Sequence, residues 1–303
     1  MKSVKFNQFL FSTVAATIAA TSLAIGSHAQ ADTLKKIAES GQITLAYREA
    51  SVPFSYLAGA GAPVGFSVDI SNAIADSVKK RLNNPNIKVA LQAVTSQNRI
   101  PLLQNGTIDL ECGSTTNNST RGKDVQFAIN HFYTGTRLLA KKTSKIKNYA
   151  DVAKKTVAST VGTTNAQMLR KYNTDQNLSI DIMLAKDHDD AMLLVESGRA
   201  SAFAMDDILL FGLVGNAKTP SDWEVVGDSL QVEPYACMLR KDDPEFQKIV
   251  NGVISGLVKS GDFEKLYTKW FMTAIPPKNQ NLNLPMSKEL RDNLRALSDK
   301  PAL

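Results

Sequence analysis

Short apolar runs alternate with amphipathic stretches from residue 42 to residue 239, and this alternation restricts the chain to an α/β fold. We expect strands over residues 42–47, 87–94, 108–112, 156–159, 180–184, 200–205, 223–226 and 235–239. We expect helices over residues 67–82, 100–104, 189–197 and 207–214, a helix from residue 165, and a helical region over 244–271 that breaks near residue 261. A chain of 303 residues is too long for one small core, so we predict two lobes.

The pattern repeats itself at an offset of 92 residues. Leu103-Gln104-Asn105-Gly106 and Val195-Glu196-Ser197-Gly198 each end a helix and precede an apolar strand. The same offset aligns Ser96 with His188 and Ser114 with Asp206, so polar residues recur where a strand ends. A helix that ends on glycine before a strand is common, so a chance match is the alternative. Because open α/β sheets bind ligands outside the carboxyl ends of their strands, the repeat predicts two lobes that face one cleft.

The first 31 residues have the pattern of a secretory signal peptide. Lys2 and Lys5 precede an apolar and small-residue run over 9–25, and Ala29-Gln30-Ala31 supplies the small-x-small cleavage pattern. A membrane anchor is the alternative, but serine and threonine residues dilute the run. No cysteine stands at the cleavage position, so we expect an exported, soluble chain in the periplasm without a lipid anchor.

The formal net charge of +6 does not predict a nucleic-acid partner, because no basic stripe alternates with aromatic residues. The sequence contains no G-x-S-x-G, no HExxH, no P-loop pattern and no Cys or His spacing that suggests a metal site. The glycines of residues 59–65 do not fit the spacing of a dinucleotide-binding loop and indicate a turn. We therefore expect no cofactor, no metal ion and no catalytic activity.

The polar side chains that follow successive strands are anion binders. Residues 162–165 add a Gly-Thr-Thr-Asn sequence before a helix, where backbone N–H groups can receive an anion. Three arginines exceed what one carboxylate needs, and an acid nearby would repel a dianion unless the ligand also carried a cation. A small zwitterion with a second carboxylate, glutamate or aspartate, satisfies all of these groups. The candidate residues are Arg48, Ser96, Arg99, Ser114, Thr116, Arg121, Thr164, His188 and Asp206.

Several of these residues also have a simpler interpretation. Arg121, followed by Gly-Lys-Asp, is by composition alone a solvated surface charge. His188 at a helix start fits a neighbour of the cap, and Asp206 fits an N-cap. Their positions at successive strand ends favour the binding site. Three further acids are expected to serve solvent or helix ends, namely Asp109, Glu111 and Asp207.

The two cysteines of the chain, Cys112 and Cys237, are 125 positions apart. An oxidising compartment permits a disulfide, but only a fold that returns the chain can join residues so distant. The residues alone leave a bridge and two free thiols as equal alternatives.

A set of longer motifs carries a family resemblance. The motifs are RE and SVPFSY within 48–56, TSQNRIPLLQNGT over 95–107, ECGSTTNN over 111–118, GTRLL over 135–139, AKDH over 185–188, ESGRA over 196–200, MDD over 205–207, CMLRKDD over 237–243 and IPPKN over 275–279. In these stretches the chain resembles the periplasmic substrate-binding proteins of polar amino-acid ABC transporters, and within that family the glutamate/aspartate-binding branch of Gram-negative bacteria. The likeness extends over residues 34–281.

The resemblance implies a type II periplasmic-binding-protein fold. Two α/β lobes, each a mostly parallel sheet flanked by helices, are then joined by two crossover strands. This places lobe 1 at residues 32–134 and 232–275, lobe 2 at 135–231 and a C-terminal tail at 276–303, after the signal peptide at 1–31. The strand that returns to lobe 1 would bring Cys237 near Cys112. The family closes over an amino acid without catalysis, so the resemblance implies a monomer that delivers L-glutamate or L-aspartate to an inner-membrane ABC permease complex.

The resemblance also implies roles for the candidate residues at the two charged α-groups of the ligand. Arg121 and the Thr116 backbone would hold the α-carboxylate, to which Thr164 adds a contact. Ser114 and Asp206 would receive the α-ammonium group. Many members of the wider family keep Ser/Thr-x-Thr-x-x-Arg, whereas four residues separate Thr116 from Arg121 here.

The remaining candidates would surround the side-chain carboxylate of the ligand. Two alternatives stay open, a binding protein for another amino acid or dicarboxylate and a periplasmic dehydratase on the same fold. Asp206 argues against ligands without an amine, and the shortage of acid–base pairs argues against the dehydratase. The side-chain carboxylate site comprises Arg48, Ser96, Arg99 and His188.

Overall fold

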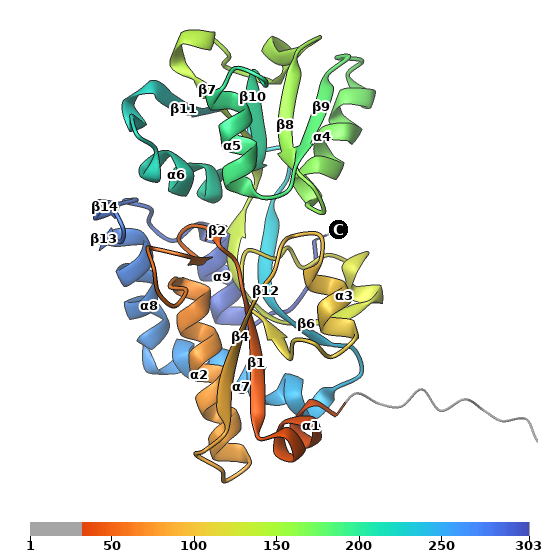
Figure 1. Cartoon of the computed structure of the whole chain (residues 1–303), viewed down its shortest axis with the longest axis vertical. Coiled ribbons are helices and arrows are strands. Elements are labelled where there is room, and N and C mark those ends of the chain that lie inside the picture. Colours follow the sequence, from red (N-terminus) through yellow and green to blue (C-terminus); the bar gives the residue numbers. More distant parts are fainter. Residues whose placement is uncertain (1–31, 303) are drawn as a thin grey trace, which may run out of the picture. The chain divides into compact units, whose positions relative to one another are not determined.

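A computed structural model describes residues 32–302 of the chain (Figure 1). The expected signal peptide, residues 1–31, lies outside the described residues. Two five-stranded sheets with flanking helices form the fold, as the α/β, two-lobe expectation requires. Among the helices of residues 32–302, none combines the length and the apolar character that crossing a membrane requires.

The first sheet contains the strands nearest the N-terminus of the described chain and one strand that returns to it. Its members are β1 (Gln42–Tyr47), β4 (Lys88–Ala93), β5 (Leu110–Glu111), β6 (Val125–Thr134) and β12 (Glu233–Arg240), in the order β4-β1-β5-β12-β6. β1 pairs in parallel with β4 and β5, whereas β12 pairs antiparallel with β5 and β6. The accompanying helices are α1 (Thr33–Ser40), α2 (Phe66–Arg81), α3 (Arg99–Gln104), α7 (Pro244–Ser260), α8 (Asp262–Tyr267), the 3₁₀ turn η1 (Arg121–Lys123) and the π-helical turn η5 (Thr268–Met272).

The second sheet is formed entirely by the middle of the chain. Its members are β7 (Thr136–Lys141), β8 (Thr156–Thr160), β9 (Asp181–Ala185), β10 (Ala202–Asp206) and β11 (Trp223–Val226), in the order β11-β7-β10-β8-β9. β8 pairs in parallel with β9 and β10, whereas β7 pairs antiparallel with β10 and β11. The helices are α4 (Thr164–Asp175), α5 (His188–Glu196) and α6 (Asp207–Asn216), with 3₁₀ turns η2 (Lys142–Ser144), η3 (Tyr149–Val152) and η4 (Pro220–Asp222).

Both sheets are mixed, where mostly parallel sheets were expected. In each sheet two neighbouring pairs are parallel and two are antiparallel. Each antiparallel pair includes β12 or β7. These are the two strands that enter a sheet from the other one, β7 after β6 and β12 after β11. A strand that enters from the other sheet therefore runs against the neighbouring strand of the β-α-β unit.

The two passages between the sheets touch each other at a glycine. β6 leads into β7 through Gly135, and β11 leads into β12 through residues 227–232. A Cβ atom at Gly135 would overlap the Ser229 hydroxyl and the Gln231 backbone oxygen. Glycine is therefore required at this crossing because the two segments leave no room for a side chain.

The longer expected elements up to residue 272 agree with the observed ones, but α1, β6 and β7 were not predicted, and neither were the short hairpins and the 3₁₀ turns. β6 carries Gln126, Asn130 and His131 among its apolar residues, so the sequence lacks the pattern of a buried strand. Asn130 and His131 are nevertheless fully buried. The expected repeat is present: α3 and α5 are each followed by a glycine with positive φ, Gly106 at 79° and Gly198 at 75°, and then by β5 and β10.

An aromatic cluster packs against the first sheet and positions the segment after β1. The ring of Phe54 lies 4.8 Å from Phe132, 5.2 Å from Tyr235 and 5.6 Å from Phe271, measured between centroids. Edge-to-face packing of this kind adds about 0.5–1.5 kcal/mol to the burial of each ring. The cluster therefore fixes the loop between β1 and α2 relative to β12, which carries Tyr235.

Two small hairpins and a C-terminal helix complete the described chain. The hairpin strands are β2 (Ala50–Ser51), β3 (Ser55–Tyr56), β13 (Ala274–Ile275) and β14 (Gln280–Asn281), and the helix is α9 (Lys288–Ala296). α9 buries Leu290 and Leu294. The C-terminal segment therefore packs onto the fold, a placement that the sequence left open.

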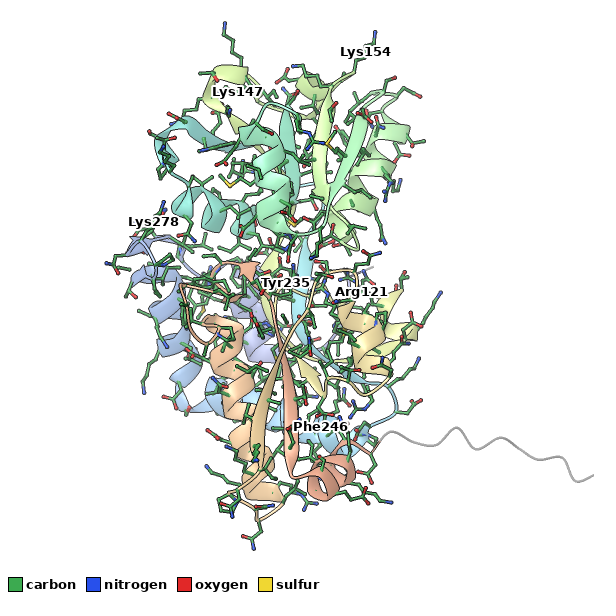
Figure 2. The ribbon with its side chains drawn as sticks, viewed as in Figure 1. Arg121, Lys147, Lys154, Tyr235, Phe246 and Lys278 are labelled. Atoms are coloured by element: carbon green, nitrogen blue, oxygen red, sulfur yellow. A yellow bond between two sulfur atoms is a disulfide. The ribbon has the colours of Figure 1, made fainter. Side chains whose placement is uncertain are left out.

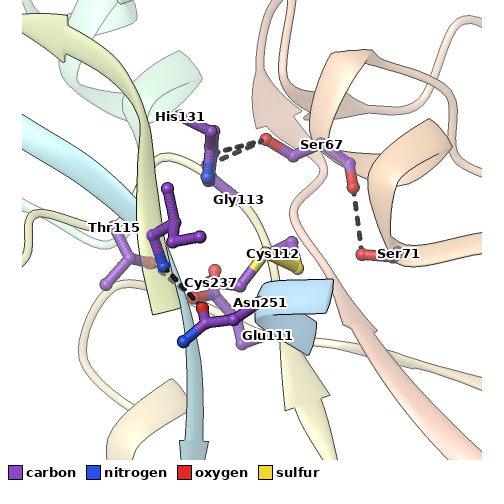
Figure 3. Close-up of a disulfide and its surroundings, with 10 residues drawn as sticks. Ser67, Ser71, Glu111, Cys112, Gly113, Thr115, His131, Cys237 and Asn251 are labelled. Atoms are coloured by element: carbon purple, nitrogen blue, oxygen red, sulfur yellow. Dashed lines mark hydrogen bonds between the residues drawn. A yellow bond between two sulfur atoms is a disulfide. The ribbon is translucent and has the colours of Figure 1, made fainter. Parts of the chain in front are cut away.

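A disulfide bond joins two strands of the first sheet. Cys112 directly follows β5 and Cys237 lies in β12, with the two Cα atoms 4.2 Å apart (Figure 3). Both residues are fully buried. The bond therefore lies next to the loop that begins at Gly113, and the structure contains the bridge that the residues alone left undecided.

Replacing both cysteines, Cys112→Ser with Cys237→Ser, is expected to lower the free energy of unfolding by about 3–5 kcal/mol. The bond closes a loop across a separation of 125 residues, which restricts the unfolded chain strongly. Guanidinium chloride unfolding of the oxidised wild type and of the variant measures the difference. Wild type unfolded under reducing conditions is the control and should match the variant. Equal midpoints for the variant and the oxidised wild type would contradict this expectation.

Candidate functional site

The nine candidate residues all follow the carboxyl ends of parallel strands. In the first sheet they come after β1, β4 and β5, and in the second sheet after β8, β9 and at the end of β10. Such ends are where open α/β sheets bind ligands. All nine are at most 9% exposed, namely Arg48, Ser96, Arg99, Ser114, Thr116, Arg121, Thr164, His188 and Asp206.

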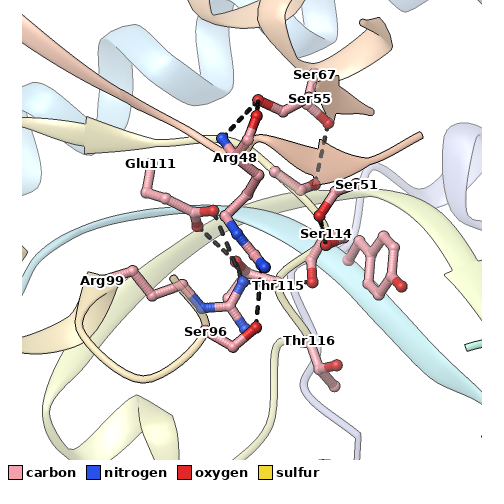
Figure 4. Close-up of polar contacts among 12 residues, drawn as sticks. Arg48, Ser51, Ser55, Ser67, Ser96, Arg99, Glu111, Ser114, Thr115 and Thr116 are labelled. Atoms are coloured by element: carbon pink, nitrogen blue, oxygen red, sulfur yellow. Dashed lines mark hydrogen bonds and ion pairs between the residues drawn. The ribbon is translucent and has the colours of Figure 1, made fainter. Parts of the chain in front are cut away.

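Arg48 connects the two sheets through its guanidinium group. One terminal nitrogen donates to the Ser96 hydroxyl at 3.0 Å (Figure 4). The other donates to the Asp187 carboxylate at 2.5 Å and lies 3.3 Å from Nε2 of His188. Asp187 precedes α5 and also accepts a hydrogen bond from the His188 backbone, so it is both a helix cap and the counter-ion of Arg48.

His188 is uncharged at neutral pH. Burial and the neighbouring Arg48 guanidinium lower the pKa of His188 to about 3. Because Arg48 can only donate, Nε2 of the imidazole is the acceptor, and Nδ1 carries the proton toward the Thr160 hydroxyl 2.9 Å away. Both ring nitrogens therefore have hydrogen-bond partners, and the imidazole is a neutral polar group instead of a general base.

Arg99 is fully buried beside an acid that was not expected in the site. Its terminal nitrogen donates to the Thr115 hydroxyl and lies 3.8 Å from Glu111, whose other oxygen accepts from Thr115 at 2.5 Å. Burial lowers the pKa of Arg99 to about 9, so the group stays charged at neutral pH. The expectation that Glu111 serves solvent or a helix end is wrong, since it is 1% exposed.

Asp109 also differs from its expected role. Its carboxylate is fully buried and accepts from Lys36 at 2.7 Å and from Arg240 at 2.9 Å. It ties α1 and β12 to the start of β5 and does not face solvent. Asp207 does serve a helix end, because it accepts from the Ile208 backbone at the start of α6.

Three polar atoms of the arginine region have no partner within the described part of the chain. They are Nε of Arg48, Nε of Arg99 and Oε1 of Glu111, each completely buried. Buried donors and acceptors without partners are rare in folded proteins and cost about 1–3 kcal/mol each. Two of the three atoms belong to arginines that the sequence assigns to the binding site.

Arg121 is buried at 9% exposure, so its interpretation as a solvated surface charge is excluded (Figure 2). One terminal nitrogen donates to the Thr116 backbone oxygen at 2.9 Å, and the other donates to the Gly162 backbone oxygen at 3.2 Å. Burial lowers the pKa of Arg121, and the nearby carboxylate of Glu233 opposes that effect. The side chain thus spans from the loop after β5 to the loop before α4.

Glu233, at the start of β12, was not predicted. One carboxylate oxygen accepts from the Thr116 hydroxyl at 2.7 Å and from the Thr164 hydroxyl at 2.8 Å. Thr116 and Thr164 themselves lie 3.3 Å apart, hydroxyl to hydroxyl. The acid therefore connects the crossover strand with both halves of the site, and no local sequence pattern indicated it.

Asp206 occupies the N-cap position of α6, but its side chain makes no cap hydrogen bond. Instead it accepts from the Asn165 amide at 2.8 Å and from the Tyr235 hydroxyl at 2.5 Å. Burial and the neighbouring Glu233 raise the pKa of Asp206 to about 8. The residue is therefore an acid held in an environment that favours either a proton or a cationic partner.

Ser114 lies between these groups. Its hydroxyl donates to the Ser51 hydroxyl at 3.1 Å, and its backbone oxygen accepts from Arg99 at 3.4 Å. The structure thus connects the predicted residues through a network that also includes Asp187, Glu111, Glu233 and Tyr235. Of these four, only Asp187 had a usable signal, because an aspartate before a helix start is a common cap.

The arrangement buries three arginines together with several acids at the strand ends of both sheets. Buried arginines face one region and a buried acid faces the other, which suits a molecule with both carboxylates and an amine. Within residues 32–302, no group of three or more His, Cys, Asp and Glu side chains could hold a metal ion.

Comparisons with known proteins agree with this chemistry. The sequence model of bacterial extracellular solute-binding proteins, family 3, matches residues 43–273. An L-glutamate/L-aspartate-binding protein of Pseudomonas aeruginosa is 50% identical over 271 residues, which cover 89% of this chain and 90% of that protein. A glutamate/aspartate import solute-binding protein of Escherichia coli is 50% identical over 272 residues, 90% of each chain. A crystal structure of a mutant arginine-binding protein from T. maritima superposes with a TM-score of 0.70 at 27% identity, covering 79% of this chain and 99% of that one.

The raised pKa of Asp206 predicts that the ligand-free protein loses stability as the pH rises from about 4 to about 8. In this range the folded protein holds a proton that the unfolded chain releases, so each pH unit costs up to about 1.4 kcal/mol. The Asp206→Asn variant, whose amide resembles the protonated acid, should show a flatter dependence. Urea unfolding of both proteins at pH 5, 6, 7 and 8 measures the slopes. Parallel slopes for the two proteins would refute the assignment of this proton to Asp206.

Proposed function

The chain belongs to family 3 of the bacterial extracellular solute-binding proteins, and from this premise we propose that it binds L-glutamate and L-aspartate. It is the substrate-binding component of an amino-acid ABC importer, a binding protein and not an enzyme. The observation that carries the choice of ligand is the set of three buried arginines beside the buried acid Asp206. A ligand with two carboxylates and one ammonium group can form ion pairs with the arginines and with Asp206.

We assign the α-groups of the ligand to the region around Arg121. The α-carboxylate contacts Arg121, the Thr116 backbone and Thr164. The α-ammonium group contacts Ser114 and Asp206, whose ionisation then becomes favourable because a cation replaces its proton. The Arg121 guanidinium already lies against the Thr116 carbonyl, which supports this assignment.

We assign the side-chain carboxylate to the region between the two other arginines. Arg48 and Arg99 each keep a buried Nε without a partner, which supports a carboxylate at this place. Ser96 holds Arg48 from the first sheet, and His188 holds it from the second. Asp187 and Glu111 offset the charges of Arg48 and Arg99, and His188 is neutral, so hydrogen bonds from the guanidinium groups would hold the carboxylate here.

The proposed ligand site lies between two lobes that close on it. We assign lobe 1 to residues 32–134 and 232–275, lobe 2 to residues 135–231 and the tail to residues 276–303. Several contacts join the lobes at the site. Arg48 reaches Asp187 and His188, and Arg121 reaches the Gly162 carbonyl. Thr164 contacts Thr116 and Glu233, and Tyr235 donates to Asp206. Hinge closure over a ligand is the typical transition of periplasmic binding proteins.

Gly162 makes the close approach of the lobes possible. A Cβ at this position would lie 2.7 Å from Cα of Gln97 and 2.9 Å from the carbonyl carbon of Ser96, which belong to the facing loop. The φ of Gly162 is +77°, which also favours glycine. The backbones of the two lobes thus meet directly beside the arginines.

The proposed role requires export and a membrane partner. We propose that residues 1–31 are removed as a signal peptide and that the mature protein works in the periplasm as a monomer. It would deliver its amino acid to an inner-membrane permease complex of the ABC class. A dicarboxylate without an amine is less suitable as a ligand, because it would lack the ammonium group that we assign to Ser114 and Asp206.

Calorimetric titration is expected to show that L-glutamate and L-aspartate bind at least about 100-fold more tightly than L-glutamine and L-asparagine. A neutral amide leaves buried guanidinium groups without the charge-assisted hydrogen bonds that contribute about 1.5–3 kcal/mol each. The four amino acids share their α-groups, so they control for the α-site. Equal affinity for acids and amides would overturn the assigned ligand.

A double variant, Arg99→Gln with Glu111→Gln, is expected to weaken L-glutamate binding about 10- to 100-fold and L-glutamine binding only slightly. The two changes together remove a buried charge and its counter-ion, so no unpaired charge remains in the core. Titration of both amino acids into both proteins measures the effect. Glu111→Gln alone is the matched control, which should retain tight binding of L-glutamate because both arginines remain. An equal loss for both amino acids in the double variant would contradict the role of Arg99.

A further inference from the structure

The C-terminal segment after β13 forms a strap across the first sheet, defined here as residues 276–302. α9 lies against β6, where Leu290 and Leu294 are buried and Asn293 donates to the Asn130 backbone oxygen at 2.7 Å. The Tyr133 hydroxyl of β6 donates in turn to Asn293 at 3.1 Å. The strap is therefore fixed to the crossover strand by polar contacts as well as by apolar packing.

Beyond α9, successive residues of the strap form hydrogen bonds with Asn130. The Asn130 backbone N–H donates to the Ser298 oxygen at 3.0 Å. Its side-chain amide donates to the Lys300 oxygen at 2.8 Å. Asn130 is completely buried, and each of its polar groups has a partner in the strap or in Asn117. This polar residue in the middle of a buried strand therefore fixes the strap to β6 by hydrogen bonds.

Asn117 extends the same network to the loop that carries the ligand groups. Its side-chain amide donates to Asn130 Oδ1 at 3.0 Å and to the Asp299 backbone oxygen at 2.8 Å. Its backbone oxygen accepts from the Ala302 N–H at 2.9 Å, and Asn118 forms a parallel bridge with Ala302. In Figure 1 the C-terminal end of the chain accordingly lies beside this part of the first sheet.

The opposite edge of the loop is bound to β12. The Asn117 N–H donates to the Pro234 oxygen at 2.8 Å, and Thr116 forms an antiparallel bridge with Tyr235. Residues 115–118 therefore lie as a middle strand between β12 on one side and the end of the strap on the other. The adjacent Thr116 carbonyl is the group that holds Arg121.

We propose that the strap is a positioning element of the amino-acid site, which fixes the Thr116 carbonyl and Arg121 through Asn117. The inference rests on the proposed function, because it concerns the same α-carboxylate contacts. The family model ends at residue 273, so the strap is an addition to the part of the fold that the model describes. Its contacts with the loop are made through backbone groups of residues 298–302 and the buried amides of Asn117 and Asn130.

Deletion of residues 298–303 tests the proposal, because α9 remains in place while the partners of Asn117 and Asn130 are removed. We expect the shortened chain to bind L-glutamate and L-aspartate about tenfold more weakly, with the same factor for both. The expected cause is faster dissociation, which stopped-flow fluorescence measures. Lys288→Ala with Arg295→Ala, on the exposed face of α9, is the control and should bind as wild type does.

A double-mutant cycle separates positioning from general destabilisation. In an Arg121→Lys background the deletion should weaken binding by clearly less than tenfold, because one of the groups that the strap positions is already altered. In a Ser96→Ala background the deletion should still cost about tenfold. Asn130→Asp, which keeps the shape of the side chain but loses the donor to Lys300, should weaken binding in the same direction as the deletion.

The outcomes distinguish the strap from the site itself. Equal affinity of the wild type and the shortened chain would overturn the strap proposal and leave the ligand assignment intact. The same loss in the Arg121→Lys and Ser96→Ala backgrounds would also overturn it, because the strap would then act on stability alone. Failure of the wild type to bind either acid would overturn the proposed function, and the strap proposal with it.

Discussion

The burial of three guanidinium groups in one place is the constraint on which the rest of the site depends. Removing an ion from water costs several kcal/mol unless a charge or a set of hydrogen bonds replaces the solvent. Each arginine has its own partners, which are Asp187 for Arg48, Glu111 for Arg99 and two backbone carbonyl groups for Arg121. Asp187 and Glu111 were not predicted as site residues, but the burial of the predicted Arg48 and Arg99 requires them as counter-ions.

The same constraint determines the charge of the other titratable groups. His188 lies against Arg48 and is held neutral, so it contributes hydrogen bonds without adding a fourth positive charge. Asp206 is buried near Glu233, so its pKa is raised, and a cation beside it would favour the ionised form. The arginine region favours negatively charged partners, whereas Asp206 favours a positively charged one. A ligand that presents carboxylates near the arginines and an ammonium group near Asp206 satisfies both.

The sequence predicts the parts of this site that follow from local order. Strand ends are visible as apolar runs, so the sequence places Arg48 after the strand at 42–47 and His188 after the strand at 180–184. Glu233 could not be found in this way, because its role depends on the return of the chain through β12. β6 was missed because Asn130, which binds the strap, breaks its apolar pattern. Local patterns thus indicate the strands and loops, while contacts between distant segments remain invisible to them.

Under the proposed function, closure of the lobes contributes directly to the pairing of the arginines. The second lobe supplies Asp187 to Arg48 and the Gly162 carbonyl to Arg121, so both guanidinium groups gain partners when the lobes meet. Unpartnered nitrogens nevertheless remain on Arg48 and Arg99 within the described chain, and a carboxylate of the ligand can satisfy them. An amide supplies no such charge, so it stabilises the closed form less than an acid does. The proposed selectivity for acidic amino acids and the proposed closure therefore have the same origin, the need of buried arginines for negatively charged partners.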